Sequence, residues 1–106
     1  MKRGTVVWVD VSDTQPPEVG KVRPGIIVSG TVHNEVLDTV VVVPTSSVPP
    51  EIRPLRLAVG RFAGQGSFAV LPGIRQGSKS RLRGTLGELS QDQLAELDAC
   101  LEAYLR

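Results

Sequence analysis

Two uninterrupted apolar runs of strand length restrict the fold more than any other feature of the chain. They are residues 25–29 (GIIVS) and 39–44 (TVVVVP). Short runs rich in β-branched residues indicate strands, and apolar residues at successive positions indicate burial on both faces of a sheet. We therefore predict two central strands. Shorter patterns bounded by Gly and Pro predict outer strands at 5–11, 55–59, 68–71 and 82–86.

Only the last part of the chain has a helical period. Ser90 and Gln93 form a capping-box pair, and apolar residues then recur at helical spacing, at Leu94, Leu97, Leu101, Tyr104 and Leu105. Many short strands followed by one amphipathic helix predict an α+β fold, with a small curled antiparallel sheet or partly open barrel. With 106 residues, the chain has room for a single domain spanning residues 1–106.

Composition excludes several classes of protein. The chain is 41% hydrophobic and 22% charged, so we expect a globular protein, and no stretch has the length of a membrane span. Cys100 is the only cysteine and lies among apolar residues, which predicts a buried thiol and a cytoplasmic location. One cysteine and one histidine rule out a tetrahedral zinc site made of His and Cys, and no clustered carboxylates indicate a metal cage, so we expect no metal and no cofactor.

Basic residues are unevenly placed, although the net charge is only +1. Seven of the 12 Lys and Arg residues fall between Arg53 and Arg83, and an eighth is Arg23. Arg23 precedes Pro24, which favours an extended backbone and places the guanidinium at the entrance of a strand. Because a guanidinium is a planar fork of donors, it suits a phosphate. A purely solubilising arginine is the alternative.

Three hydroxyl residues, Thr45, Ser46 and Ser47, follow the 39–44 run. If the two central strands pair in antiparallel fashion, these hydroxyls and Arg23 meet at one edge of the sheet, within reach of one phosphate. The alternative is a turn whose hydroxyls bond only to the local backbone. Glu18, in a Pro-rich loop, is a possible general base or an exposed loop charge.

Other side chains are weaker candidates for chemistry. His33 lies in a predicted turn, where an imidazole could titrate near neutral pH, although turn histidines are usually incidental. Trp8 and Phe68 are expected in the core, because the chain has only four aromatic residues to supply core volume. Base stacking on exposed aromatics is therefore disfavoured.

Five segments, taken in order, resemble the MazF/PemK family of bacterial toxins. They are RGTVVWVDV (3–11), EVGKVRPGIIVS (18–29), VVVVPTSS (40–47), IRQGSKSRL (74–82) and LGELSQDQLAELDACLEAYL (86–105). The resemblance implies an SH3-like β-barrel with a C-terminal helix, and a homodimer. It also implies a sequence-specific, metal-independent endoribonuclease toxin that inhibits translation and growth. In that family the 2′-hydroxyl of the RNA attacks, leaving a 2′,3′-cyclic phosphate and a 5′-hydroxyl.

The resemblance also implies roles for individual residues. Arg23 matches the essential arginine before proline, Ser46 matches a catalytic threonine, and Glu18 matches a loop carboxylate. The residues expected to contact RNA are Lys21, Thr45, Ser47, Arg75, Lys79 and Arg81. Gly73, Gln76 and Ser78 replace the family's Gln, Thr and Asp, and Pro72 stands where some members carry an acid–base carboxylate, so no carboxylate base is expected from that segment.

The implied partners are single-stranded RNA and a cognate antitoxin whose acidic C-terminal tail docks in the basic cleft. Three rival hypotheses remain. A gyrase-poisoning toxin with the same barrel uses aromatic and apolar residues at its extreme C-terminus, which AYLR (103–106) does not resemble. An SH3-like peptide binder needs an exposed aromatic groove. A degenerate relative would bind RNA without cutting it.

Overall fold

The computed structural model describes residues 1–10 and 22–106. Its strands are β1 (Thr5–Asp10), β2 (Val22–Ile27), β3 (Thr39–Ser46), β4 (Arg56–Phe62), β5 (Gln65–Val70), β6 (Arg75–Ser78) and β7 (Leu82–Glu88). The helices are α1 (Thr31–Val36) and α2 (Gln91–Tyr104), with short 3₁₀ turns η1 (Leu71–Gly73) and η2 (Lys79–Arg81). No helix in these residues is long and apolar enough to cross a membrane.

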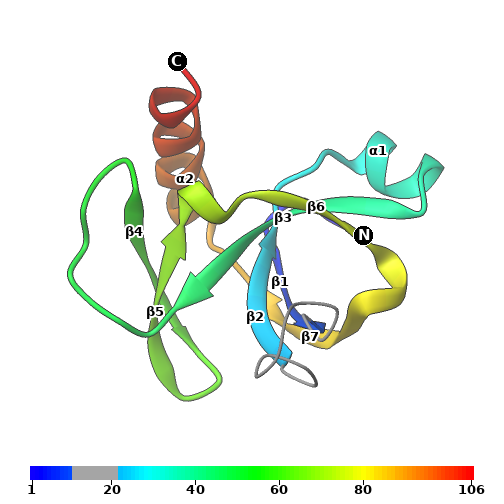
Figure 1. Cartoon of the computed structure of the whole chain (residues 1–106), viewed down its shortest axis with the longest axis horizontal. Helices are drawn as coiled ribbons and strands as arrows, with labels where there is room; N and C mark the ends of the chain where they lie inside the picture. Colours follow the sequence, from blue (N-terminus) through cyan, green and yellow to red (C-terminus); the bar gives the residue numbers. More distant parts are fainter. Residues whose placement is uncertain (11–21) are drawn as a thin grey trace.

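The seven strands form one curled antiparallel sheet, as Figure 1 shows. The strand order is β4-β5-β3-β2-β1-β7, and β6 pairs with β3 off this path. The two apolar runs therefore belong to the central strands β2 and β3, which confirms the prediction. Together with one C-terminal helix, the curled sheet confirms the α+β, barrel-like fold.

Strand β3 has two different partners on one of its edges. Its first half pairs with β6, with Val42 opposite Arg75, and its end pairs with β5, with Thr45 opposite Ala69. Its other edge pairs with β2, with Ile26 opposite Val43. The sheet therefore forks along β3.

The core consists of two clusters of aliphatic side chains. The larger one joins β1–β5 to α2 and includes Ile26, Val43, Leu57 and Leu97. The smaller one lies on the other side of the central strands and contains Val7, Ile27, Val40 and Val42. Cys100 is buried in the larger cluster, as predicted, and burial raises the pKa of its thiol.

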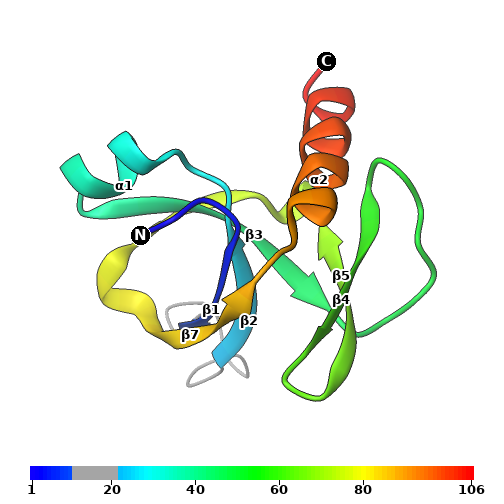
Figure 2. The ribbon, with the colours of Figure 1, turned by 180° about the vertical axis from the view of Figure 1, so that it is seen from behind.

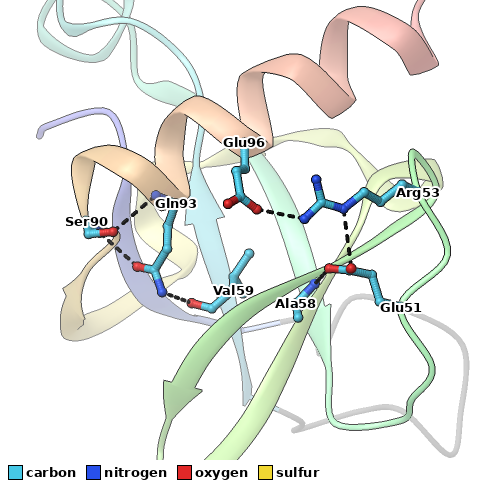
Figure 3. A network of polar contacts seen from close by, with 7 residues as sticks. All are labelled: Glu51, Arg53, Ala58, Val59, Ser90, Gln93 and Glu96. Atoms are coloured by element: carbon cyan, nitrogen blue, oxygen red, sulfur yellow. Dashed lines mark hydrogen bonds and ion pairs between the residues drawn. The ribbon is translucent and has the colours of Figure 1, made fainter.

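Polar contacts join α2 to β4 and to the segment before it, as Figure 3 shows. Ser90 and Gln93 form the predicted capping box, and Gln93 Nε2 also donates to the Val59 carbonyl at 3.0 Å. Arg53 bridges to Glu96 on α2 at 2.8 Å. The helix is thus held by its apolar face and by contacts at its N-terminal half. Figure 2 shows α2 beside β4 and β5, with α1 at the far side of the sheet.

Several sequence predictions were wrong in detail. β2 begins at Val22 and β3 extends to Ser46, so these ends are strand rather than loop. Residues 75–81, where no strand or helix was predicted, form β6 and η2, and the predicted turn around His33 is the helix α1. The expected core residues Trp8 and Phe68 are only half-buried, and Leu105 is exposed.

Candidate RNA-cleavage site

Arg23 lies in the first half of β2, with an exposed side chain. Val9 of β1 pairs with Arg23, and Trp8 pairs with Pro24, so the backbone before the proline is extended, as expected. Among residues 1–10 and 22–106, no carboxylate lies within ion-pair distance of the Arg23 guanidinium. The positive charge is therefore available to an anion that approaches this end of the sheet.

The hydroxyl residues end the neighbouring strand β3, whose pairing with β2 is antiparallel, with Gly25 opposite Pro44. Continuing this register by two residues places Arg23 opposite Ser46. The Thr45 hydroxyl donates a 3.0 Å hydrogen bond to the Pro24 carbonyl, which agrees with that register. The prediction that antiparallel pairing brings Arg23 and the hydroxyls to one edge is confirmed.

The three hydroxyls differ in their surroundings. Thr45 is buried and its hydroxyl is already bonded to Pro24, so it supports the backbone rather than facing solvent. Ser46 is half-buried, and its Oγ accepts a hydrogen bond from the Val48 amide at 3.1 Å, which orients the hydroxyl and leaves its proton to donate. Ser47 is exposed.

A pocket of about 270 Å³, here called the hydroxyl pocket, contains Arg23 and the three hydroxyl residues. Its opposite wall is the tip of the β4–β5 hairpin. Its lining residues are Val22, Arg23, Pro24, Thr45, Ser46, Ser47, Phe62, Ala63, Gln65 and Ser67. The lining has one cation, several hydroxyls and no carboxylate among the residues described, which suits an anionic ligand.

A second pocket of about 190 Å³, here called the glycine pocket, shares Arg23 and Pro24 with the first. It lies between β1, β2, β3 and β6. Its lining residues are Val9, Arg23, Pro24, Gly25, Val42, Pro44, Gly73, Arg75, Gly77 and Arg81. Arg23 therefore stands between a hydroxyl-rich space and an apolar space that has further arginines.

Ion pairing separates the basic residues into two groups. Arg3, Arg53, Arg83, Arg106 and Lys2 each contact a carboxylate. In the part of the chain that the structure describes, Arg56 and Arg61 donate to backbone carbonyls rather than to a carboxylate, and Arg23, Arg75 and Lys79 also have no carboxylate partner. The last three cations thus remain uncompensated on the side of the molecule where β2, β6 and η2 meet.

The structure brings some predicted site residues together and leaves others apart. Arg75 and Arg81 line the glycine pocket, whereas Lys79 lines neither pocket. Glu18 and Lys21 lie outside the described residues. His33 lies on α1, where its Nε2 is 3.4 Å from the Thr39 hydroxyl, and lines neither pocket.

The sequence predictions missed the β4–β5 hairpin as a wall of the site. Phe62 and Gln65 pair across a two-residue turn of Ala63 and Gly64, both with positive φ (54° and 79°). This geometry is typical of a tight hairpin turn. Gly64 could have indicated a turn from the sequence, but a turn residue alone does not indicate which part of the sheet the turn approaches.

Among the described residues, the groups whose pKa is shifted from its ordinary value lie outside the two pockets. The backbone amide of Ala58 donates to the Glu51 carboxylate at 2.8 Å, and this bond, together with Arg53, holds the pKa of Glu51 below its usual value. The hydrogen bonds that Arg53 donates to the Glu51 and Glu96 carboxylates raise the pKa of Arg53. Among the described residues, no three His, Cys, Asp or Glu side chains group as metal ligands would.

Two solved structures share this fold. A mycobacterial endoribonuclease in complex with its cognate antitoxin has a TM-score of 0.83 at 23% identity, covering 99% of this chain and 94% of that one. The MazE–MazF complex of Deinococcus radiodurans has a TM-score of 0.79 at 22% identity, covering 99% and 94%. At these identities the likeness defines the fold, which is that of MazF-type toxins.

The family follows from the sequence comparison. Residues 2–105 match the family described as PemK-like, MazF-like toxin of type II toxin-antitoxin system. The chain therefore belongs to this family. It is also 29% identical over 109 residues to the endoribonuclease MazF of Staphylococcus epidermidis, covering 99% of this chain and 91% of that protein.

Proposed function

We propose that this protein is the toxin of a type II toxin–antitoxin pair and acts as a sequence-specific, metal-independent endoribonuclease. Family membership and the endoribonuclease MazF of S. epidermidis support the class of activity. One structural observation carries the assignment to a site. Arg23, which has no carboxylate partner among the described residues, lines the same pocket as Ser46.

The proposed reaction needs no nucleophile from the protein. The 2′-hydroxyl of the RNA loses its proton and attacks the adjacent phosphorus, and the bond to the 5′-oxygen breaks as that oxygen takes up a proton. The products are a 2′,3′-cyclic phosphate and a 5′-hydroxyl. The protein has to align the attack and stabilise the charge on the pentacoordinate phosphorus.

Arg23 and Ser46 fit the second of these tasks. A guanidinium donates two parallel hydrogen bonds to phosphate oxygens and keeps its charge at any working pH. The Ser46 hydroxyl accepts from the Val48 amide and can donate its own proton to a third phosphate oxygen. Neither pocket lining contains a carboxylate among the residues described, so Glu18 remains the proposed base.

The basic surface around the proposed site also indicates the partners of the protein. The uncompensated cations Arg23, Arg75 and Lys79 suit the RNA backbone. They equally suit the acidic C-terminal tail of an antitoxin, which would exclude RNA by occupying the same charges. The D. radiodurans MazF structure contains MazE, its antitoxin. We propose the same kind of partner, a homodimer, and action in the cytoplasm, where cleavage of RNA would inhibit translation and growth.

The test is end-group mapping of a defined RNA after incubation in EDTA with wild type, Arg23→Ala and Ser46→Ala. We expect cuts at specific sites with cyclic-phosphate ends. Loss of a donor to transition-state charge lowers kcat by about 10²- to 10³-fold, and we expect Arg23→Ala to reach this range. Arg106→Ala is the matched control, because Arg106 is paired with Glu102 at the end of α2.

Three results would contradict the proposal. Intact RNA across varied sequences with wild type would leave a binding toxin or a degenerate relative. Cuts that disappear in EDTA, or that persist at full rate in Arg23→Ala, would refute the proposed mechanism.

A further inference from the structure

The glycine pocket is small and adjoins the proposed phosphate site. Pockets for drug-sized ligands measure roughly 300–1,000 Å³, and this one measures about 190 Å³. We propose that it binds the base on one side of the phosphate held by Arg23 and selects guanine or uracil, which carry a keto oxygen (O6 or O4) where adenine and cytosine carry an amine. This inference rests on the proposed function and adds the residues that choose the cleavage sequence.

Strand register explains why the pocket exists. Val42 pairs with Arg75 and Val40 pairs with Gly77, so Gly77 faces the same side of the sheet as the two valines. A Cβ built on Gly77 has no heavy atom within 4 Å beyond its chain neighbours, so the absent side chain leaves open space. At Gly25 a Cβ would lie 2.6 Å from Val42 Cγ1, so the floor there is already closely packed.

The shape of the pocket suits a flat apolar face. Val9, Val42 and Pro44 supply apolar surface, and the open space at Gly77 lets a planar ring approach the backbone. A base that leaves water for this surface gains from burial, while its sugar and phosphate stay outside near Arg23. Single-stranded RNA can present a base in this way, because its bases are free to unstack and turn outward.

The rim supplies the selectivity. Among the lining residues that the structure describes, only the arginines have polar side chains, and they are Arg23, Arg75 and Arg81. Guanidinium groups donate hydrogen bonds and accept none. The keto oxygens of guanine and uracil accept such bonds, and guanine can take a bidentate pair at O6 and N7. At the positions of guanine O6 and uracil O4, adenine and cytosine carry exocyclic amines, which would face the arginine donors.

The position of Arg23 links base selection to catalysis. Because Arg23 lines both pockets, an RNA whose base occupies the glycine pocket has its backbone beside the hydroxyl pocket. A base that fits poorly moves the phosphate away from Arg23 and Ser46. Misplacement of the phosphate by about 1 Å costs on the order of 10²-fold in rate. The rate of cleavage therefore depends on how well the base fits the glycine pocket.

The test compares wild type, Gly77→Val and Gly30→Val on a library of RNAs with randomised sequence. Gly77 and Gly30 both have open space around a built Cβ, and Gly30 lines neither pocket. We expect wild type to favour guanine or uracil by about tenfold or more at one position next to the cut. Gly77→Val should abolish most of that preference and lower kcat/KM on the preferred RNA, whereas Gly30→Val should change neither.

A preference for adenine or cytosine beside the cut, or a keto preference that survives in Gly77→Val, would overturn the inference. Circular dichroism checks that the variants fold. If Gly77→Val does not, Gly77→Ala replaces it, with a smaller loss of preference expected.

Binding to RNAs that carry a 2′-O-methyl group, and so cannot be cut, provides a separate readout. Absence of cleavage by wild type would refute the proposed function. Keto-selective binding that Gly77→Val abolishes would support the base pocket even then, and binding without base preference would refute the base pocket.

Discussion

Replacing Thr45 by Val tests whether the hydroxyl of Thr45 joins the two strands of the site. Thr45 is 8% exposed, and its Oγ1 donates to the Pro24 carbonyl at 3.0 Å. Valine keeps the shape, so no cavity forms and the change removes one neutral hydrogen bond, worth about 0.5–1.5 kcal/mol. For a domain of this size, 1 kcal/mol corresponds to roughly 4–8 °C in Tm.

We therefore expect Thr45→Val to lower Tm by about 2–12 °C. Because the bond lies between the residues next to Arg23 and Ser46, we also expect kcat to fall more than KM rises. Thr45→Ser, which retains the hydroxyl, should recover most of both. Thermal unfolding followed by circular dichroism and steady-state cleavage of a fluorogenic RNA measure the two effects. An unchanged or higher Tm for Thr45→Val would refute this role of the hydroxyl.

Two further predictions concern the contacts around α2. Ser90→Ala removes the helix cap, so we expect the free energy of unfolding in urea to fall by about 1 kcal/mol. Ser90→Asp, which can also cap the helix, should be close to wild type. An alanine variant as stable as wild type would argue against a role for the cap. The folded-state pKa of Glu51 is depressed, so its contribution to stability is complete above the ordinary pKa of 4.5 and disappears as pH falls through the lower, folded-state value. Wild type should therefore lose its advantage over Glu51→Gln on acidification, and a difference that grows at low pH would contradict this.

The central strands and the C-terminal helix were predictable because burial imposes a recognisable pattern of apolar residues on each of them. β2 and β3 are covered on both sides, so their apolar runs are continuous, and α2 alternates Leu97 and Leu101 with exposed residues. The capping box added a local signal at Ser90. The fold class and the central position of β2 and β3 in the sheet thus follow from the pattern of hydrophobic residues alone.

The helix α1 escaped prediction because its anchor is polar. Val32 and Val36 are 75% and 72% exposed, while Asn34 is buried and its Nδ2 donates to the carbonyls of Met1 and Ser29. The hydrogen bond from the buried Asn34 amide joins residues 33 positions apart in the sequence, and the spacing of apolar residues gives no indication of it. The strand β6 was missed for a related reason, since it pairs with β3 alone and carries exposed polar residues such as Arg75.

The site was predictable in part. The proximity of Arg23 to the hydroxyls followed from antiparallel pairing of two strands close in sequence. The hairpin wall and the glycine pocket did not, because they depend on how β5 and β6 approach β3. That approach is a property of tertiary packing, and Gly77 alone does not indicate that a cavity lies above it.

The fork in β3 has a consequence for how such a protein diversifies. The strand is bordered by β6 along one half and by β5 at its end, so the glycine pocket and the hydroxyl pocket are bounded by different neighbours. Substitutions in β6 can therefore reshape the wall that faces the base while Ser46, held against β5, keeps its place. Lineages can change which RNA they recognise without first passing through forms that have lost their chemistry.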